Sequence, residues 1–103
     1  MRAALALVLV LAACGPNTET ADSARGERLA QERCAACHAI GRADVSPRAN
    51  APAFRELHRR YPVDQLAESL AEGIVTGHPD MPEQSFSPEE VNALITYLRS
   101  LER

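Results

Sequence analysis

The sequence contains no tryptophan and no lysine, and it has only four aromatic residues and three cysteines. With so few large rings, a chain of 103 residues forms only a thin apolar core unaided. All eleven basic side chains are arginines, and they form no basic stretch interleaved with aromatics, which argues against nucleic-acid binding. Convincing strand patterns, internal repeats and low-complexity tracts are also missing. The composition therefore predicts a single all-α domain that needs a ligand to complete its core.

The first residues have the pattern of an export signal. Arg2 precedes an unbroken apolar run over residues 3–13, which is too short for the ~20 residues of a membrane-spanning helix. The junction Leu11-Ala12-Ala13-Cys14 is similar to a bacterial lipobox, in which Cys14 would carry lipid and become the mature N-terminus. The alternative is ordinary cleavage beside one of the two alanines, with Cys14 as a spare thiol.

These features divide the chain into three parts. We predict a signal peptide at residues 1–13, a flexible tether at residues 14–21 and one domain at residues 22–103. The mature protein is expected to be exported to the periplasmic side and anchored by lipid to a membrane.

The five residues Cys34-Ala35-Ala36-Cys37-His38 form a C-x-x-C-H motif, which is typical of c-type haem attachment. Two thiols three positions apart lie on one face of a helical turn, where each can form a thioether to one haem vinyl group. The next imidazole, His38, can then bind the iron as the proximal ligand. The motif therefore predicts one covalent haem c held by Cys34, Cys37 and His38.

Two other uses of a C-x-x-C motif are less consistent with this sequence. A thioredoxin-like dithiol would need a preceding strand and a βαβ pattern, and no run with a period of two occurs nearby. A zinc site would need a second pair of ligands at matching spacing. The only other candidates are His58 and His78, which lie twenty residues apart, and we interpret His58 as a surface residue of a short helix.

Helix signals follow the motif along the chain. The first helix, capped by Asp22 or Ser23, is expected to run to the haem motif, and a short helix is expected over residues 55–60. Pro62 opens the next helix, which is expected to end at the cap Gly73. The last helix begins at Ser87-Pro88-Glu89-Glu90, where Ser87 and Glu90 form a capping box, and it continues to the C-terminus.

The second iron ligand is predicted to be Met81. It is the only methionine that remains after removal of the signal, and it lies in a segment with proline on either side, away from any apolar stripe. A thioether is a suitable axial ligand, and His/Met ligation raises the reduction potential of the haem. His78 is the alternative, and bis-His ligation would lower the potential.

The charges are distributed unevenly along the chain. Residues 42–60 contain five arginines against two acids, whereas residues 61–103 contain eight acids against two arginines. One interpretation is a solvated surface without a specific role. The other is that some central arginines pair with haem propionates and that the charge asymmetry steers docking to a redox partner.

The chain resembles the small monohaem class I cytochromes c of bacteria over about residues 22–101. The matching segments are Gly26 and Leu29, Cys34–His38, Ala51–Phe54, residues 73–82 and Leu94–Leu98. The resemblance implies a cytochrome c fold of three main helices and a short helix around one haem.

The resemblance also implies specific contacts. The first and last helices should cross closely, with Gly26 allowing the approach and Tyr97 packing there. Pro52 should support His38 by accepting a hydrogen bond from its ring N–H. The chain departs from the family pattern at Ala30, where an aromatic is frequent, so looser packing is expected at the crossing. The lysine-rich docking face of the family is absent as well.

The function predicted from these features is electron transfer. With both axial positions filled by His38 and Met81 no substrate reaches the iron, and no nucleophile or paired carboxylates lie beside the motif. We therefore expect an electron carrier and no enzyme: a monomer that docks transiently with redox partner proteins. The alternatives are a ligand sensor or peroxidase-like protein in which Met81 dissociates, and a haem subunit of a membrane oxidoreductase complex.

Overall fold

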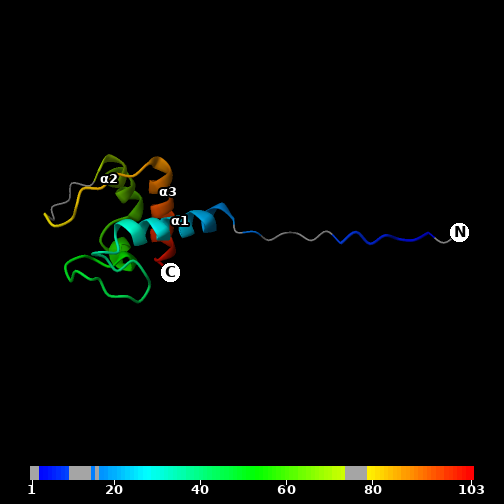
Figure 1. Cartoon of the computed structure of the whole chain (residues 1–103), viewed down its shortest axis with the longest axis horizontal. Helices are drawn as coiled ribbons and strands as arrows, with labels where there is room; N and C mark the ends of the chain where they lie inside the picture. Colours follow the sequence, from blue (N-terminus) through cyan, green and yellow to red (C-terminus); the bar gives the residue numbers. More distant parts are fainter. Residues whose placement is uncertain (1–2, 10–14, 16, 74–78) are drawn as a thin grey trace.

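The computed structural model describes residues 3–9, 15, 17–73 and 79–103 (Figure 1). Its elements, in chain order, are the α-helix α1 (Thr18–Arg33), the 3₁₀-helices η1 (Phe54–Arg59) and η2 (Val63–Gln65), and the α-helices α2 (Leu66–Glu72) and α3 (Pro88–Ser100). The described ranges contain no strand. The all-α prediction is thus confirmed, with three main helices, the short helix η1 and an additional 3₁₀ turn that leads into α2.

Helix α1 begins earlier than the sequence suggested. We expected Asp22 or Ser23 as the cap, but the helix starts at Thr18, and the side chain of Asn17 accepts a hydrogen bond from the Thr20 N–H at 2.8 Å. Asparagine is among the best N-cap residues, and it satisfies a donor that the first turn leaves free. Residues 18–21, which we had assigned to a tether, are therefore helical.

Helices α1 and α3 cross in close contact, as the resemblance implied (Figure 1). Gly26 lies at the crossing, where an added Cβ would overlap the Ala93 carbonyl and come within 2.8 Å of the Tyr97 Cβ. Only glycine allows this approach. Ala30, where we expected looser packing, is 0% exposed, so the small side chain is fully enclosed.

Helix α3 buries more apolar residues than any other element. The predicted capping box is present: Ser87 Oγ accepts from the Glu90 N–H at 3.2 Å, and Glu90 Oε1 accepts from the Ser87 N–H at 3.0 Å. The buried residues of α3 are Val91, Ala93, Leu94, Ile95, Tyr97 and Leu98. By contrast α1 buries only Gly26 and Ala30. Helix α1 is therefore held in place by the fit of small residues against α3, and contributes little apolar area of its own.

The segment before α2 differs from the prediction at its start and agrees with it at its end. Pro62 precedes the 3₁₀ turn η2, so the α-helix itself begins at Leu66. Leu66 and Leu70 pack, half-buried, against the core. Gly73 ends the helix with a φ of 91°, a conformation that glycine adopts without strain, as predicted. Ile74, which we placed on the same stripe, lies outside the described residues.

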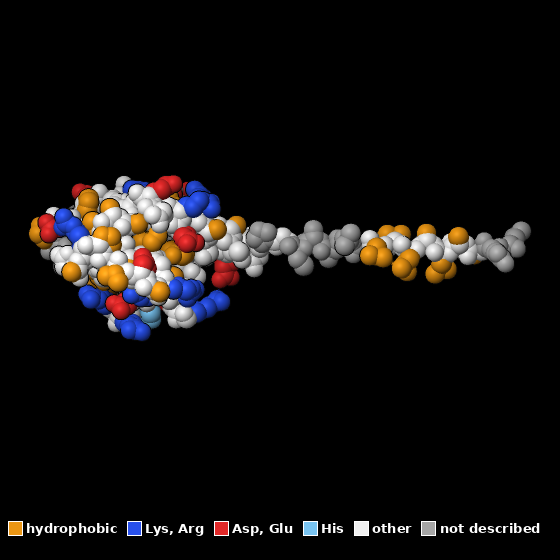
Figure 2. Space-filling model, turned by 60° about the horizontal axis from the view of Figure 1, so that its bottom comes forward, with side chains coloured by type: hydrophobic (Ala, Val, Ile, Leu, Met, Phe, Trp, Pro, Cys, Tyr) orange, Lys and Arg blue, Asp and Glu red, His pale blue; other side chains and the backbone are white. Residues whose placement is uncertain are grey.

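The described part of the N-terminal run, residues 3–9, is not helical, and its large apolar side chains are exposed (Figure 2). No helix among the described residues is long and apolar enough to cross a membrane. Cys14 lies outside the described residues, so the signal peptide and the lipid anchor stay predictions.

Candidate haem-binding site

The C-x-x-C-H motif forms a single turn at the end of α1. The N–H groups of Cys34 and Ala35 both donate to the Ala30 carbonyl, at 2.9 and 3.0 Å, which ties the start of the motif to the helix. The Cys37 and His38 N–H groups then donate to the Cys34 carbonyl, at 3.2 and 3.0 Å. The two cysteines are therefore separated by one helical turn, the spacing that two thioether bonds to one haem require.

The Cys34 thiol does not have the lowered pKa of a reactive redox dithiol. Cys34 and Cys37 are both half-buried and are not joined by a disulfide. Burial raises the pKa of the Cys34 thiol to about 11, although the neighbouring Arg33 acts in the opposite direction. Reactive dithiols have lowered pKa values. The described residues contain no group of three or more His, Cys, Asp or Glu side chains that could hold a metal ion.

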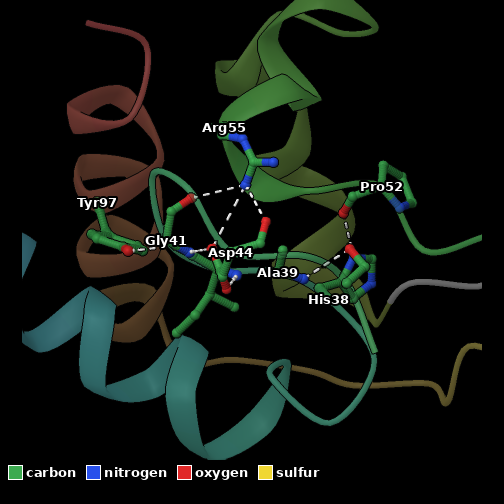
Figure 3. Close-up of polar contacts among 9 residues, drawn as sticks. His38, Ala39, Gly41, Asp44, Pro52, Arg55 and Tyr97 are labelled. Carbon is green, nitrogen blue, oxygen red and sulfur yellow. Dashed lines mark hydrogen bonds and ion pairs between the residues drawn. The ribbon is translucent and has the colours of Figure 1, made fainter. Parts of the chain in front are cut away.

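The His38 ring is held by the backbone carbonyl of Pro52, fourteen residues later in the chain. Its Nδ1 lies 2.7 Å from the Pro52 carbonyl oxygen (Figure 3). Because a carbonyl can only accept, Nδ1 carries the proton and the lone pair of Nε2 stays available for a metal. The Phe54 ring lies 5.3 Å from the His38 ring at an angle of 51° and restricts its rotation. The contact that the resemblance implied between His38 and Pro52 is thus present.

The loop after the motif is ordered by two side chains that accept hydrogen bonds from it. The carboxylate of Asp44 accepts from the Ile40 N–H at 3.1 Å and from the Gly41 N–H at 2.9 Å. Ser46 Oγ accepts from the Ala39 N–H at 2.9 Å. Sequence reasoning had assigned no role to this stretch. An Asp three to four residues after N–H groups that no helix uses is a local signal, and it could have identified Asp44 as their acceptor.

Two long side chains connect this loop to the rest of the fold (Figure 3). Arg55 Nη1 donates to the Asp44 carbonyl at 2.8 Å and to the Gly41 carbonyl at 3.4 Å, and it lies 3.6 Å from the Asp44 carboxylate. The Tyr97 hydroxyl donates to the Ile40 carbonyl at 2.5 Å. Helix α3 therefore holds the His38 loop directly, in addition to packing against α1.

Met81, the predicted second ligand, is half-buried in the segment that precedes α3. Its neighbour Asp80 lies 3.5 Å from Arg48, and the Arg48 N–H donates to the Cys37 carbonyl at 3.1 Å. Arg48 thus links the residue next to Met81 to the haem motif. His78, the alternative ligand, lies outside the described residues.

The edge of the core offers apolar surface for contact with a large apolar group. Several apolar side chains beside the core are only partly buried, among them Leu29, Cys34, Ala35, Leu57, Leu66, Ala67 and Leu70. The groups that the structure brings together are two thiols one turn apart and an imidazole with its Nε2 free, and the Met81 thioether stays a predicted ligand. These groups are soft or borderline ligands and thioether formers, and they fit an iron porphyrin attached through both cysteines.

His58 lies in η1 and lines a cavity together with several of the central arginines. His58 is half-buried rather than a surface residue as expected, and within the described part of the chain its Nδ1 is buried without a hydrogen-bond partner. It lines a cavity of about 320 Å³ with Arg42, Arg55, Glu56, Arg59, Leu101, Glu102 and Arg103. Arg42 donates there to the Ser100 carbonyl at 2.6 Å. The contacts of Arg42, Arg48 and Arg55 show that three of the five central arginines have partners within the protein.

The all-α fold and the site together define a small protein that carries one covalently attached haem c with its iron. A family model described as cytochrome c matches residues 23–102, which is most of the chain. The chain belongs to the cytochrome c family, which confirms the predicted resemblance to class I cytochromes c. No curated protein and no solved structure shows a significant match to it.

Proposed function

We propose that this haem c electron-transfer protein is a one-electron carrier with His38 and Met81 as its axial ligands. The observation that carries the proposal is the hydrogen bond between His38 Nδ1 and the Pro52 carbonyl, at 2.7 Å. It fixes the ring in the tautomer that offers Nε2 to a metal, directly beside the two attachment thiols.

The protein residues divide the work between the two faces of the haem. Bound haem supplies the iron that takes up and releases the electron. His38 would bind the iron on one face of the haem, with its ring held by Pro52 and Phe54. The Met81 thioether would bind on the other face, where it would favour the reduced iron and leave no position for a substrate. A carrier of this kind needs only a transient contact with its donor and acceptor.

The setting that we propose is the periplasmic side of a membrane, in a respiratory or dehydrogenase chain. It is supported by the apolar run before Cys14 and by the lipobox pattern, which together favour export and a lipid on Cys14. A tethered monomer could serve successive redox partner proteins at the same membrane. Intact mass of the mature protein tests the anchor, because an unmodified Cys14 would remove it.

The ligation is tested by optical spectra of the purified holoprotein, oxidised and reduced, before and after addition of cyanide or carbon monoxide. We expect a low-spin spectrum with the ferric iron–thioether charge-transfer band and little binding of added ligand. Met81→Ala should lose that band and should bind cyanide readily. His78→Ala, the matched control, should leave both the band and the ligand binding unchanged.

The opposite pattern would refute the proposal. If the wild type lacked the thioether band, and if only His78→Ala altered the spectrum and the ligand binding, His78 would be the second ligand. Rapid uptake of carbon monoxide or cyanide by the wild type would indicate an open site and a sensor or peroxidase-like protein.

A further inference from the structure

Arg33, the residue immediately before Cys34, reaches across to the segment that carries Met81. Its Nη2 donates to the Ser85 carbonyl at 3.1 Å, and its guanidinium carbon lies 3.8 Å from the centre of the Phe86 ring. Its Nη1 lies 3.9 Å from the Glu90 carboxylate. A single side chain at the end of α1 therefore contacts this segment through a hydrogen bond and a cation–π contact, and it forms an ion pair with the first turn of α3.

The contact is reinforced from the opposite direction. Gln84 Nε2 donates to the backbone carbonyl of Arg33 at 2.8 Å. Phe86 is 6% exposed, and its N–H donates to the Leu70 carbonyl at 3.0 Å, which fixes the end of the segment against α2. The backbone just before the first haem cysteine and the backbone shortly after Met81 are thus joined in both directions.

We propose that Arg33 is a positioning residue that holds residues 79–86 (the Met81 segment) so that the Met81 thioether stays within reach of the iron. The inference rests on the proposed His38/Met81 ligation and adds the residue that maintains it. Arg33 does not touch the reacting atoms. It acts by restricting the backbone that carries the ligand.

The second link to the Met81 segment, between Arg48 and Asp80, is expected to be weaker. Their side chains are 51% and 64% exposed, whereas those of Arg33 and Glu90 are 31% and 28% exposed. Exposed ion pairs are strongly screened by water and salt and contribute little. Arg48→Ala is therefore a matched control, because it removes an arginine that contacts the same segment without the cation–π and carbonyl contacts.

The experiment uses purified ferric holoproteins: wild type, Arg33→Ala, Arg33→Lys, Arg48→Ala and Tyr97→Phe. The readouts are the intensity of the iron–thioether charge-transfer band, the rate of imidazole binding to the iron and the reduction potential. For Arg33→Ala we expect roughly tenfold faster imidazole binding, the factor that about 1.4 kcal/mol produces, with a weaker band and a lower potential. Arg33→Lys keeps the charge but not the planar fork, so it should recover part of this change.

Tyr97→Phe separates positioning from a general loss of stability. It removes the hydrogen bond to the Ile40 carbonyl on the His38 side, so it should lower the melting temperature without opening the Met81 side. The inference is overturned if Arg33→Ala binds imidazole within twofold of the wild type, or if Arg48→Ala or Tyr97→Phe accelerates binding as much. A wild type without the thioether band would instead refute the ligation itself, which keeps the two failures distinct.

Discussion

The two sides of the haem site are held in different ways. On the His38 side, the chain folds back on itself within twenty residues, where the carbonyl of Pro52 and the carboxylate of Asp44 accept hydrogen bonds, and the Tyr97 hydroxyl adds one contact from α3. On the Met81 side, the described contacts come mainly from more distant parts of the chain, chiefly Arg33 and Arg48.

This difference has a consequence for stability. A ligand held by a local network stays in place as long as its own loop is folded, whereas a ligand held by distant contacts depends on the packing of several elements. The Met81 side should therefore open before the His38 side under destabilising conditions, as a local event below the cost of global unfolding.

The largest effect is expected from removing the covalent attachment, which lies on the His38 side. In Cys34→Ala,Cys37→Ala no thioether can form, so acidified organic solvent should extract the haem completely, while the wild type retains it. Loss of the cofactor should also lower the melting temperature sharply, because the small core depends on it. Cys14→Ser is the control and should keep its haem. Retention of haem by the double variant would contradict covalent attachment.

A smaller effect is expected from the local network itself. Asp44→Ala leaves the Ile40 and Gly41 N–H groups and Arg55 without their carboxylate partner, which should cost about 1–2 kcal/mol of unfolding free energy. Asp44→Asn keeps one acceptor and should cost less. Chemical denaturation of the holoproteins measures both. Since Met81 is not involved, the thioether band should persist in both variants, and its loss would show that the two sides are not independent.

The smallest effect concerns pH and the Met81 side. Hydrogen bonding from the Ser87 backbone, together with charges that include Arg33, lowers the pKa of Glu90 from its ordinary 4.5. Because the pKa of Glu90 is lower in the folded state, its ionised carboxylate stabilises the fold at a pH above the unfolded-state pKa. This contribution disappears as the pH falls through the folded-state pKa. The stability of the wild type relative to Glu90→Gln should therefore be greater at neutral pH than below 4.5. Thermal unfolding across this range measures it, and a constant difference would contradict the assignment.

Much of this architecture could be predicted because its signals are local. The haem motif, the capping box at Ser87 and the end of α2 at Gly73 each depend on residues within a few positions of one another. The tether was predicted too long because Asn17 was not recognised as a cap.

The contacts of Arg33 could not be read from the sequence for a different reason. Arg33 is separated from Ser85 by 52 positions, and nothing in the sequence near either residue indicates the other. The hydrogen bond from Tyr97 to the Ile40 carbonyl, 57 positions away, could not be predicted for the same reason. Such contacts exist only after the helices have packed, so tertiary structure and not local propensity determines them.

The crossing at Gly26 also bears on the order in which the molecule can assemble. The meeting of Gly26 with Ala93 closes a loop that spans most of the domain, so it forms only after the last helix has been synthesised. Until then α1 is a polar segment whose buried residues, Gly26 and Ala30, have nothing to pack against. Before this contact forms, Cys34 and Cys37 therefore lie on a stretch of chain that is accessible to haem attachment.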